Sequence, residues 1–256
     1  MIETINKDEN FVLVIADTAI RSFRNQGDKD YILARKAYRW EFYSHFHWSG
    51  LQALEKYIKC ILLFNRISSC NMGHNLEEGL KLLSQVEYVQ LNESTIDTIH
   101  YFHTFGLNRY LTWSYIETEA NLHKLDRAIW DIRKYCKNLN KKFSHKSTEI
   151  LNLELEKIHK STLDKPKEMY IPGGYLEIIL TKKKSTVRKD LIWQNGYFFT
   201  KSRKTVSHPQ VMYCENSPLT LSPQYAEELS KLIYLSKDEI NAFKNELNRR
   251  LKSKEK

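Results

Sequence analysis

Basic and aromatic residues alternate in the last third of the 256-residue chain. Basic runs flank a short aromatic segment that contains Trp193, and their members are Lys182, Lys183, Lys184, Arg188, Lys189, Lys201, Arg203 and Lys204. Cations that meet phosphates beside rings that stack on bases are typical of single-stranded nucleic-acid binding. We therefore predict such a surface here. The competing interpretation, that the aromatics are buried and the lysines merely solvated, fits the pattern at least as well.

Arg109 follows Asn108, a residue type that often caps helices. In the first turn of a helix, Arg109 would lie beside free backbone N–H groups, where a phosphate binds favourably. The alternative is an arginine that pairs with a carboxylate of the core. His100 and His103 have a spacing that a metal could use, but no third ligand matches it. We expect no metal and no cofactor.

These residues must be positioned mainly by helices, because the chain has only 8 Gly and 5 Pro. Apolar residues at three- and four-residue steps predict helices over 10–24, 30–43, 44–64, 74–83, 94–105 and 109–139. Asn25 to Gly27 and the capping residue Asp28 predict a break between the first two helices. The short loops between these segments predict an antiparallel up-and-down helical bundle.

The pattern changes after Pro166, where short β-prone runs replace the long helical ones. They predict strands over 175–181, 191–194, 197–200 and 211–214, with Asn195-Gly196 as a hairpin turn, and helices over 223–235 and 237–252. The expected fold is mainly α: the bundle, then a small α+β unit with a three- or four-stranded antiparallel meander. The expected division is an N-terminal helix (1–27), the bundle (28–143), a connecting helix (144–165) and the basic unit (166–256).

The formal net charge is +9, and most of it belongs to the C-terminal part. Residues 1–150 hold 20 basic and 18 acidic residues, against 20 and 13 in 151–256. The four cysteines are scattered without a CxxC pair, which favours a reduced, cytoplasmic protein. Apolar stretches end well before the roughly 20 residues that cross a bilayer, so no membrane span is expected.

Four short elements within about residues 28–138 occur in an order that is itself informative. They are Ala34-Arg35, Gln52-Ala53-Leu54-Glu55-Lys56, Gly73-His74-Asn75-Leu76 and Arg109-Tyr110. In this order the segment resembles the prokaryotic HEPN family. The resemblance implies a dimeric helical bundle that binds RNA or a nucleotide, with a partner protein in a toxin–antitoxin or phage-defence setting. The ligand-binding residues that it implies are Arg35, Gln52, Glu55, Lys56, Lys59, His74, Arg109 and Tyr110. Ion pairing along the helix surface, as between Glu55 and Lys59, is an equally good interpretation of several of them.

Some HEPN proteins cut RNA without a metal, using an arginine and a histidine near the start of the last helix. The arginine would neutralise charge on the phosphorane, and the histidine would transfer protons. Four to six residues after Arg109 there is no histidine, and Tyr115, with an ordinary pKa near 10, is a poor base. Arg39 and His45 have the required spacing elsewhere. RNA or nucleotide binding is thus the leading hypothesis; the alternatives are a metal-independent endoribonuclease, using Arg109, Tyr115, Arg39 or His45, and a non-catalytic helical interaction module.

Overall fold

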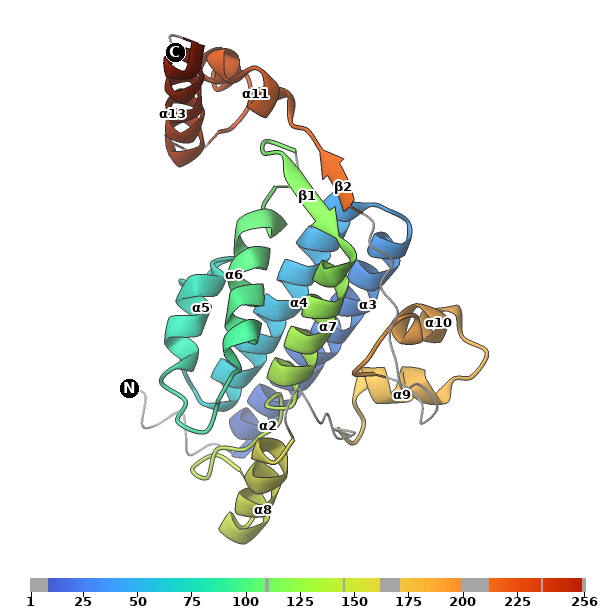
Figure 1. Ribbon diagram of the computed structural model, residues 1–256. Helices are drawn as coiled ribbons and strands as arrows, with labels where there is room; N and C mark the ends of the chain where they lie inside the picture. The colour runs from blue at the N-terminus through green and yellow to red at the C-terminus, as the bar shows by residue number, and fades with distance from the viewer. Residues whose placement is uncertain are drawn as a thin grey trace.

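The computed structural model describes residues 9–108, 111–144, 146–161, 171–198, 212–235 and 237–254 (Figure 1). The described chain is mainly helical and has one small two-stranded antiparallel sheet. A bundle that contains α3, α4, α6 and α7 forms the middle of the molecule, and the last helices lie beyond one end of it (Figure 1). Within the described ranges, no helix has the length and apolarity that crossing a membrane requires.

The first helices form one run without the predicted break. α2 (Glu9–Thr18) continues through the π-helix η1 (Ala19–Arg24) into α3 (Asn25–Arg39), so the predicted end at Asn25 to Gly27 is wrong. Gly27 serves close packing instead of a turn. A Cβ atom at Gly27 would lie 3.2 Å from Tyr57 Cε1 and 3.3 Å from the Ala53 carbonyl oxygen, both on α4. The missing side chain therefore lets α3 approach α4.

α4 (Tyr43–Phe64) is the central helix and confirms the helix predicted over 44–64. Leu51, Leu54, Ile58, Ile61 and Leu62 are fully buried on it, as their spacing indicated. Two shorter helices that pack beside it, α5 (Leu76–Leu83) and α6 (Glu93–Gly106), are capped by Asn75 and Asn92. They confirm the predictions over 74–83 and 94–105.

The first part of the helix predicted over 109–139 is wrong. Residues of this segment form β1 (Tyr115–Thr118) before α7 (Glu119–Arg133) begins. In β1, Tyr115 and Glu117 are buried and Ile116 is exposed, which is the period of two of a strand. Glu117 fixes β1 to α4 because its carboxylate lies 2.7 Å from His47 Nε2.

Two of the strands predicted after residue 170 are wholly or partly helical. α8 (Thr148–His159) confirms the connecting helix. α9 (Tyr175–Thr181) occupies the first predicted strand, and α10 (Thr186–Ile192) ends inside the second one, predicted over 191–194. Leu176 and Ile179 are both buried, three residues apart, which is helical spacing. Asn195 makes no hairpin turn: its side chain donates to the Leu191 carbonyl and accepts from the backbone N–H groups of Tyr197 and Phe198.

Only the last predicted strand is present among the described residues. β2 (Met212–Glu215) pairs with β1, with Tyr115 opposite Glu215, and the predicted three- or four-stranded meander is therefore not seen in this part of the chain. Tyr197 and Phe198 are not in a strand, and the rest of 197–200 lies outside the described residues.

The C-terminal helices form a small unit with its own core. α11 (Pro218–Leu221) precedes the single helix predicted over 223–235, in whose place η2 (Pro223–Tyr225) and α12 (Ala226–Leu229) are found. α13 (Lys237–Lys254) confirms the last predicted helix. Phe243 of α13 stacks on Trp113, with ring centroids 4.3 Å apart. This contact joins the unit to the loop before β1.

Two buried arginines fasten α9 and α10 to the bundle. Arg133 of α7 binds Asp28 of α3 through Nε and Nη2, at 2.7 and 2.8 Å, and Glu177 of α9 through Nη1 and Nη2, both at 2.8 Å. Asp28, predicted to be a helix cap, is therefore a buried partner of Arg133. Arg35 of α3 pairs with Asp126 and donates to the carbonyls of Asp190 and Trp193, at the end of α10.

Gly50 of α4 lets the ring of Phe102 pack against the helix backbone. A Cβ atom there would lie 2.3 Å from Phe102 Cε1, in the core. We expect Gly50→Ala to lower the free energy of unfolding by about 1–3 kcal/mol because the core is overpacked, even though alanine favours a helix. The matched control is Gly79→Ala on α5, whose nearest contact is the flexible methyl group of Met72. Urea unfolding should rank Gly50→Ala as the less stable variant, and the reverse order would contradict this packing.

Candidate functional site: a cationic groove between α3 and α10

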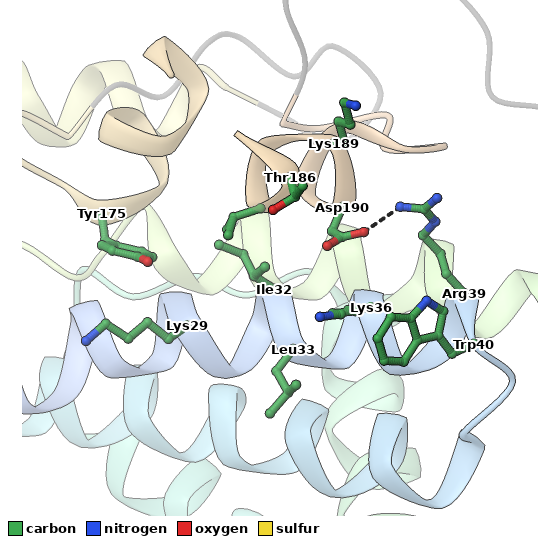
Figure 2. A pocket seen from close by; sticks show the side chains of 11 residues that line it. Lys29, Ile32, Leu33, Lys36, Arg39, Trp40, Tyr175, Thr186, Lys189 and Asp190 are labelled. Atoms are coloured by element: carbon green, nitrogen blue, oxygen red, sulfur yellow. Dashed lines mark hydrogen bonds and ion pairs between the residues drawn. The ribbon is translucent and has the colours of Figure 1, made fainter. Parts of the chain in front are cut away.

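A groove of about 560 Å³ runs between α3 and the α9–α10 pair (Figure 2). Lys29, Lys36 and Trp40 line it from α3, together with the apolar Ile32 and Leu33. These α3 residues recur every three or four positions, so they lie on one face of the helix. The facing wall comes from the start of α9 and from α10, and its residues are Tyr175, Thr186, Val187, Lys189 and Asp190.

The groove carries an excess of positive charge. Within the described part of the chain, Lys29, Lys36 and Lys189 have no ion-pair partner. Arg39 is balanced by Asp190, with which it forms an ion pair across the groove, as Figure 2 shows. Figure 2 shows the side chain of Lys189 directed away from α3, so the ammonium groups of Lys29 and Lys36 are the ones that the groove offers to an anion.

Aromatic rings accompany these cations. Trp40 is 58% exposed at one end of the groove, and Lys36 Nζ lies 4.4 Å from its ring centroid. At the other end, Lys29 Nζ lies 5.6 Å from the ring centroid of Tyr175 (Figure 2). A ring with an exposed face beside an ammonium group can stack on a base while the cation meets the adjoining phosphate.

Five of the predicted ligand-binding residues form a separate polar network. Glu55 accepts from Lys59 at 2.7 Å and lies 2.7 Å from His74 Nδ1, while Lys56 pairs with Asp30 at 2.6 Å and with Gln52 at 3.1 Å. The structure brings these residues together, but they bind one another and attach the loop before α5 to α4. This placement matches the interpretation of these residues as ion pairs along the helix surface.

Of the remaining predicted ligand-binding residues, Arg35, Arg109 and Tyr110, only Arg35 is described, and it does not line the groove. Arg35 is fully buried, and its guanidinium group is used by Asp126 and by two backbone carbonyls. It holds α10 in place and presents no surface to a ligand. Arg109 and Tyr110 lie outside the described residues.

Of the four candidate catalytic residues, Tyr115, Arg39 and His45 are described, and Arg109 lies outside the described residues. Burial, and next the hydrogen bond to Glu215, raise the pKa of Tyr115 well above its ordinary value, so its hydroxyl is a poor base. Arg39 faces Asp190 and Trp193, whereas the ring of His45 lies 6.2 Å from that of Phe42. No histidine is among the described residues that line the groove.

Some of the predicted nucleic-acid-binding residues are exposed, and others make contacts within the fold. Lys189 lines the groove, and Lys182, Lys183 and Lys184 are exposed in the turn that precedes α10. Arg188 Nε donates to the Leu180 carbonyl, and Trp193 is partly buried beneath the guanidinium of Arg39, 5.2 Å from it. Lys201, Arg203 and Lys204 lie outside the described residues.

Sequence reasoning missed the α3 wall of the groove. The steps of seven and four residues between Lys29, Lys36 and Trp40 were a usable signal, but only the packing of α10 against α3 makes a groove of that face. No group of three or more His, Cys, Asp or Glu side chains in the described ranges could hold a metal ion. No family model, curated protein or solved structure matches the chain.

Proposed function

We propose that this protein binds RNA or a nucleotide in the groove between α3 and α10. The observation that carries the proposal is the presence of Lys29 and Lys36, without a carboxylate partner in the described structure, in a groove that has a more than half-exposed tryptophan at one end. The lysines would neutralise a phosphate, and a base would stack on the tryptophan ring. A protein anion would use the lysines but would leave the ring without a planar partner.

The resemblance of residues 28–138 to HEPN proteins supports the same function. It adds to the proposal a homodimer and a partner protein in a toxin–antitoxin or phage-defence setting. Binding is favoured over cleavage because the described lining of the groove supplies no free general base: it includes arginine and lysines, and the carboxylate of Asp190 is paired with Arg39.

Salt dependence is the property that distinguishes phosphate contacts from other binding. For a single strand, the logarithm of the affinity falls with the logarithm of salt concentration, with a slope of about −0.7 per phosphate neutralised. We expect Lys29→Gln and Lys36→Gln each to weaken binding of a labelled single-stranded RNA and to reduce that slope by about 0.7. Fluorescence anisotropy at several salt concentrations measures both effects.

Lys81→Gln is the matched control, because Lys81 is a highly exposed lysine on α5, away from the groove. It should leave affinity and slope unchanged. If the groove variants bind as the control does, the lysines of the groove do not contact phosphate and the proposed site is wrong.

A further inference from the structure

A second hollow continues the groove past Lys29 and Tyr175. It has a volume of about 590 Å³ and lies along η1 and the start of α3. Lys29 and Tyr175 line both hollows, so the two meet at this pair. The groove therefore extends beyond the cationic section that supports the proposed function.

The lining of this second hollow differs in chemistry from that of the first. It holds neutral polar side chains, Ser22, Asn25 and Gln26, and an exposed surface pair in which Arg21 lies 3.2 Å from Asp17. Hydroxyl and amide groups both donate and accept hydrogen bonds, as ribose hydroxyls and base edges require. This section suits sugars and bases, whereas the first suits phosphates.

One helical face joins the two sections. Ser22, Gln26, Lys29, Lys36 and Trp40 line the two hollows and follow one another at steps of three, four or seven residues along η1 and α3. At about 1.5 Å per residue, the distance from Ser22 to Trp40 is about 27 Å, which is longer than one nucleotide. Proteins that bind single strands commonly cover about 4–16 nucleotides.

We infer that the ligand is a single strand of several nucleotides that lies along η1 and α3, not a mononucleotide. A base stacks on Trp40, phosphates lie beside Lys36 and Lys29, and the strand continues onto Ser22 and Gln26. This inference rests on the proposed function, because it extends the ligand of the same groove.

The test compares AMP, a dinucleotide, a tetranucleotide and an octanucleotide of RNA, each titrated into the full chain. Affinity should rise at each step from AMP to the tetranucleotide. The double variant Ser22→Ala, Gln26→Ala should bind the octanucleotide at least about fivefold more weakly, from the loss of two or more hydrogen bonds, and the dinucleotide as wild type does. Unchanged dinucleotide binding also shows that the variant is folded.

The matched control is Ser84→Ala, Gln85→Ala, a pair of exposed residues at the end of α5. It should bind every length as wild type does. If the octanucleotide binds no tighter than the dinucleotide, or if the Ser22 and Gln26 variant binds it normally, the extended site is wrong while the proposed function stands. If no RNA of any length binds the wild-type chain, the proposed function fails, and this inference fails with it.

Discussion

Replacing Arg133 by methionine should lower the free energy of unfolding by about 3–5 kcal/mol, which is the usual effect of removing one partner from a buried ion pair. Arg133 is 2% exposed and Asp28 is fully buried. The variant would leave the carboxylates of Asp28 and Glu177 close together without a cation. Because Glu177 belongs to α9, we also expect the groove wall to lose its attachment. Urea unfolding followed by circular dichroism measures the first effect, and amide exchange of residues 171–198 measures the second.

Two further variants separate the buried charge from other consequences of this substitution. The triple variant Arg133→Met, Asp28→Asn, Glu177→Gln removes all three charges and should recover much of the lost stability. Arg249→Met breaks an exposed pair with Glu246 on α13 and should have no measurable effect. If Arg133→Met is as stable as Arg249→Met, the buried network does not hold the fold together as described.

Replacing Trp40 by alanine should weaken binding of a short single-stranded RNA by about 5- to 150-fold. This is the loss expected when one base no longer stacks on an aromatic ring, about 1–3 kcal/mol. Trp40→Phe should retain part of the affinity, because a smaller ring still stacks. The fold should be unaffected, since Trp40 is more than half exposed. Fluorescence anisotropy gives the affinities.

Tyr234→Ala is the control for this prediction, because Tyr234 is 89% exposed and lies in the C-terminal unit, away from the groove. It should bind RNA as wild type does. Equal affinities for Trp40→Ala and Tyr234→Ala would show that no base stacks on Trp40.

The helices of the bundle could be predicted where one face is continuously apolar. The buried residues of α4 recur at helical spacing over six turns, and Asn75 and Asn92 cap the two helices that follow. The break at Gly27 was predicted wrongly because a glycine that ends a helix and a glycine that admits a neighbouring helix look the same in sequence. Only the contact with Tyr57 and Ala53 distinguishes them.

The segment after residue 170 shows a different failure. Tyr175–Thr181 is rich in β-prone residues, but Leu176 and Ile179 bury one helical face, and the docking of that face depends on Arg133 and Glu177. Tertiary contacts of this kind override local preference. The β1–β2 pairing joins residues about 100 positions apart, which a local pattern does not reveal.

The sequence indicated a surface of basic and aromatic residues, but it located only part of the groove. The basic and aromatic composition of 182–204 indicated nucleic acid, and Lys189 does line the groove. Its other wall comes from Lys29, Lys36 and Trp40, about 150 residues earlier in the chain. They lie opposite α10 only because Arg35 bonds to the carbonyls of Asp190 and Trp193 and so holds α10 against α3.

The most direct test of the groove as the RNA site is ultraviolet crosslinking of a bound single-stranded RNA, followed by mass spectrometry of the crosslinked peptides. The structure predicts crosslinks on α3, around Lys36 and Trp40, and on the facing wall, around Tyr175 and Lys189. Crosslinks confined to α13, or to the Gln52 to His74 network, would contradict the account, because they would place the RNA outside the groove that holds Lys36 and Trp40.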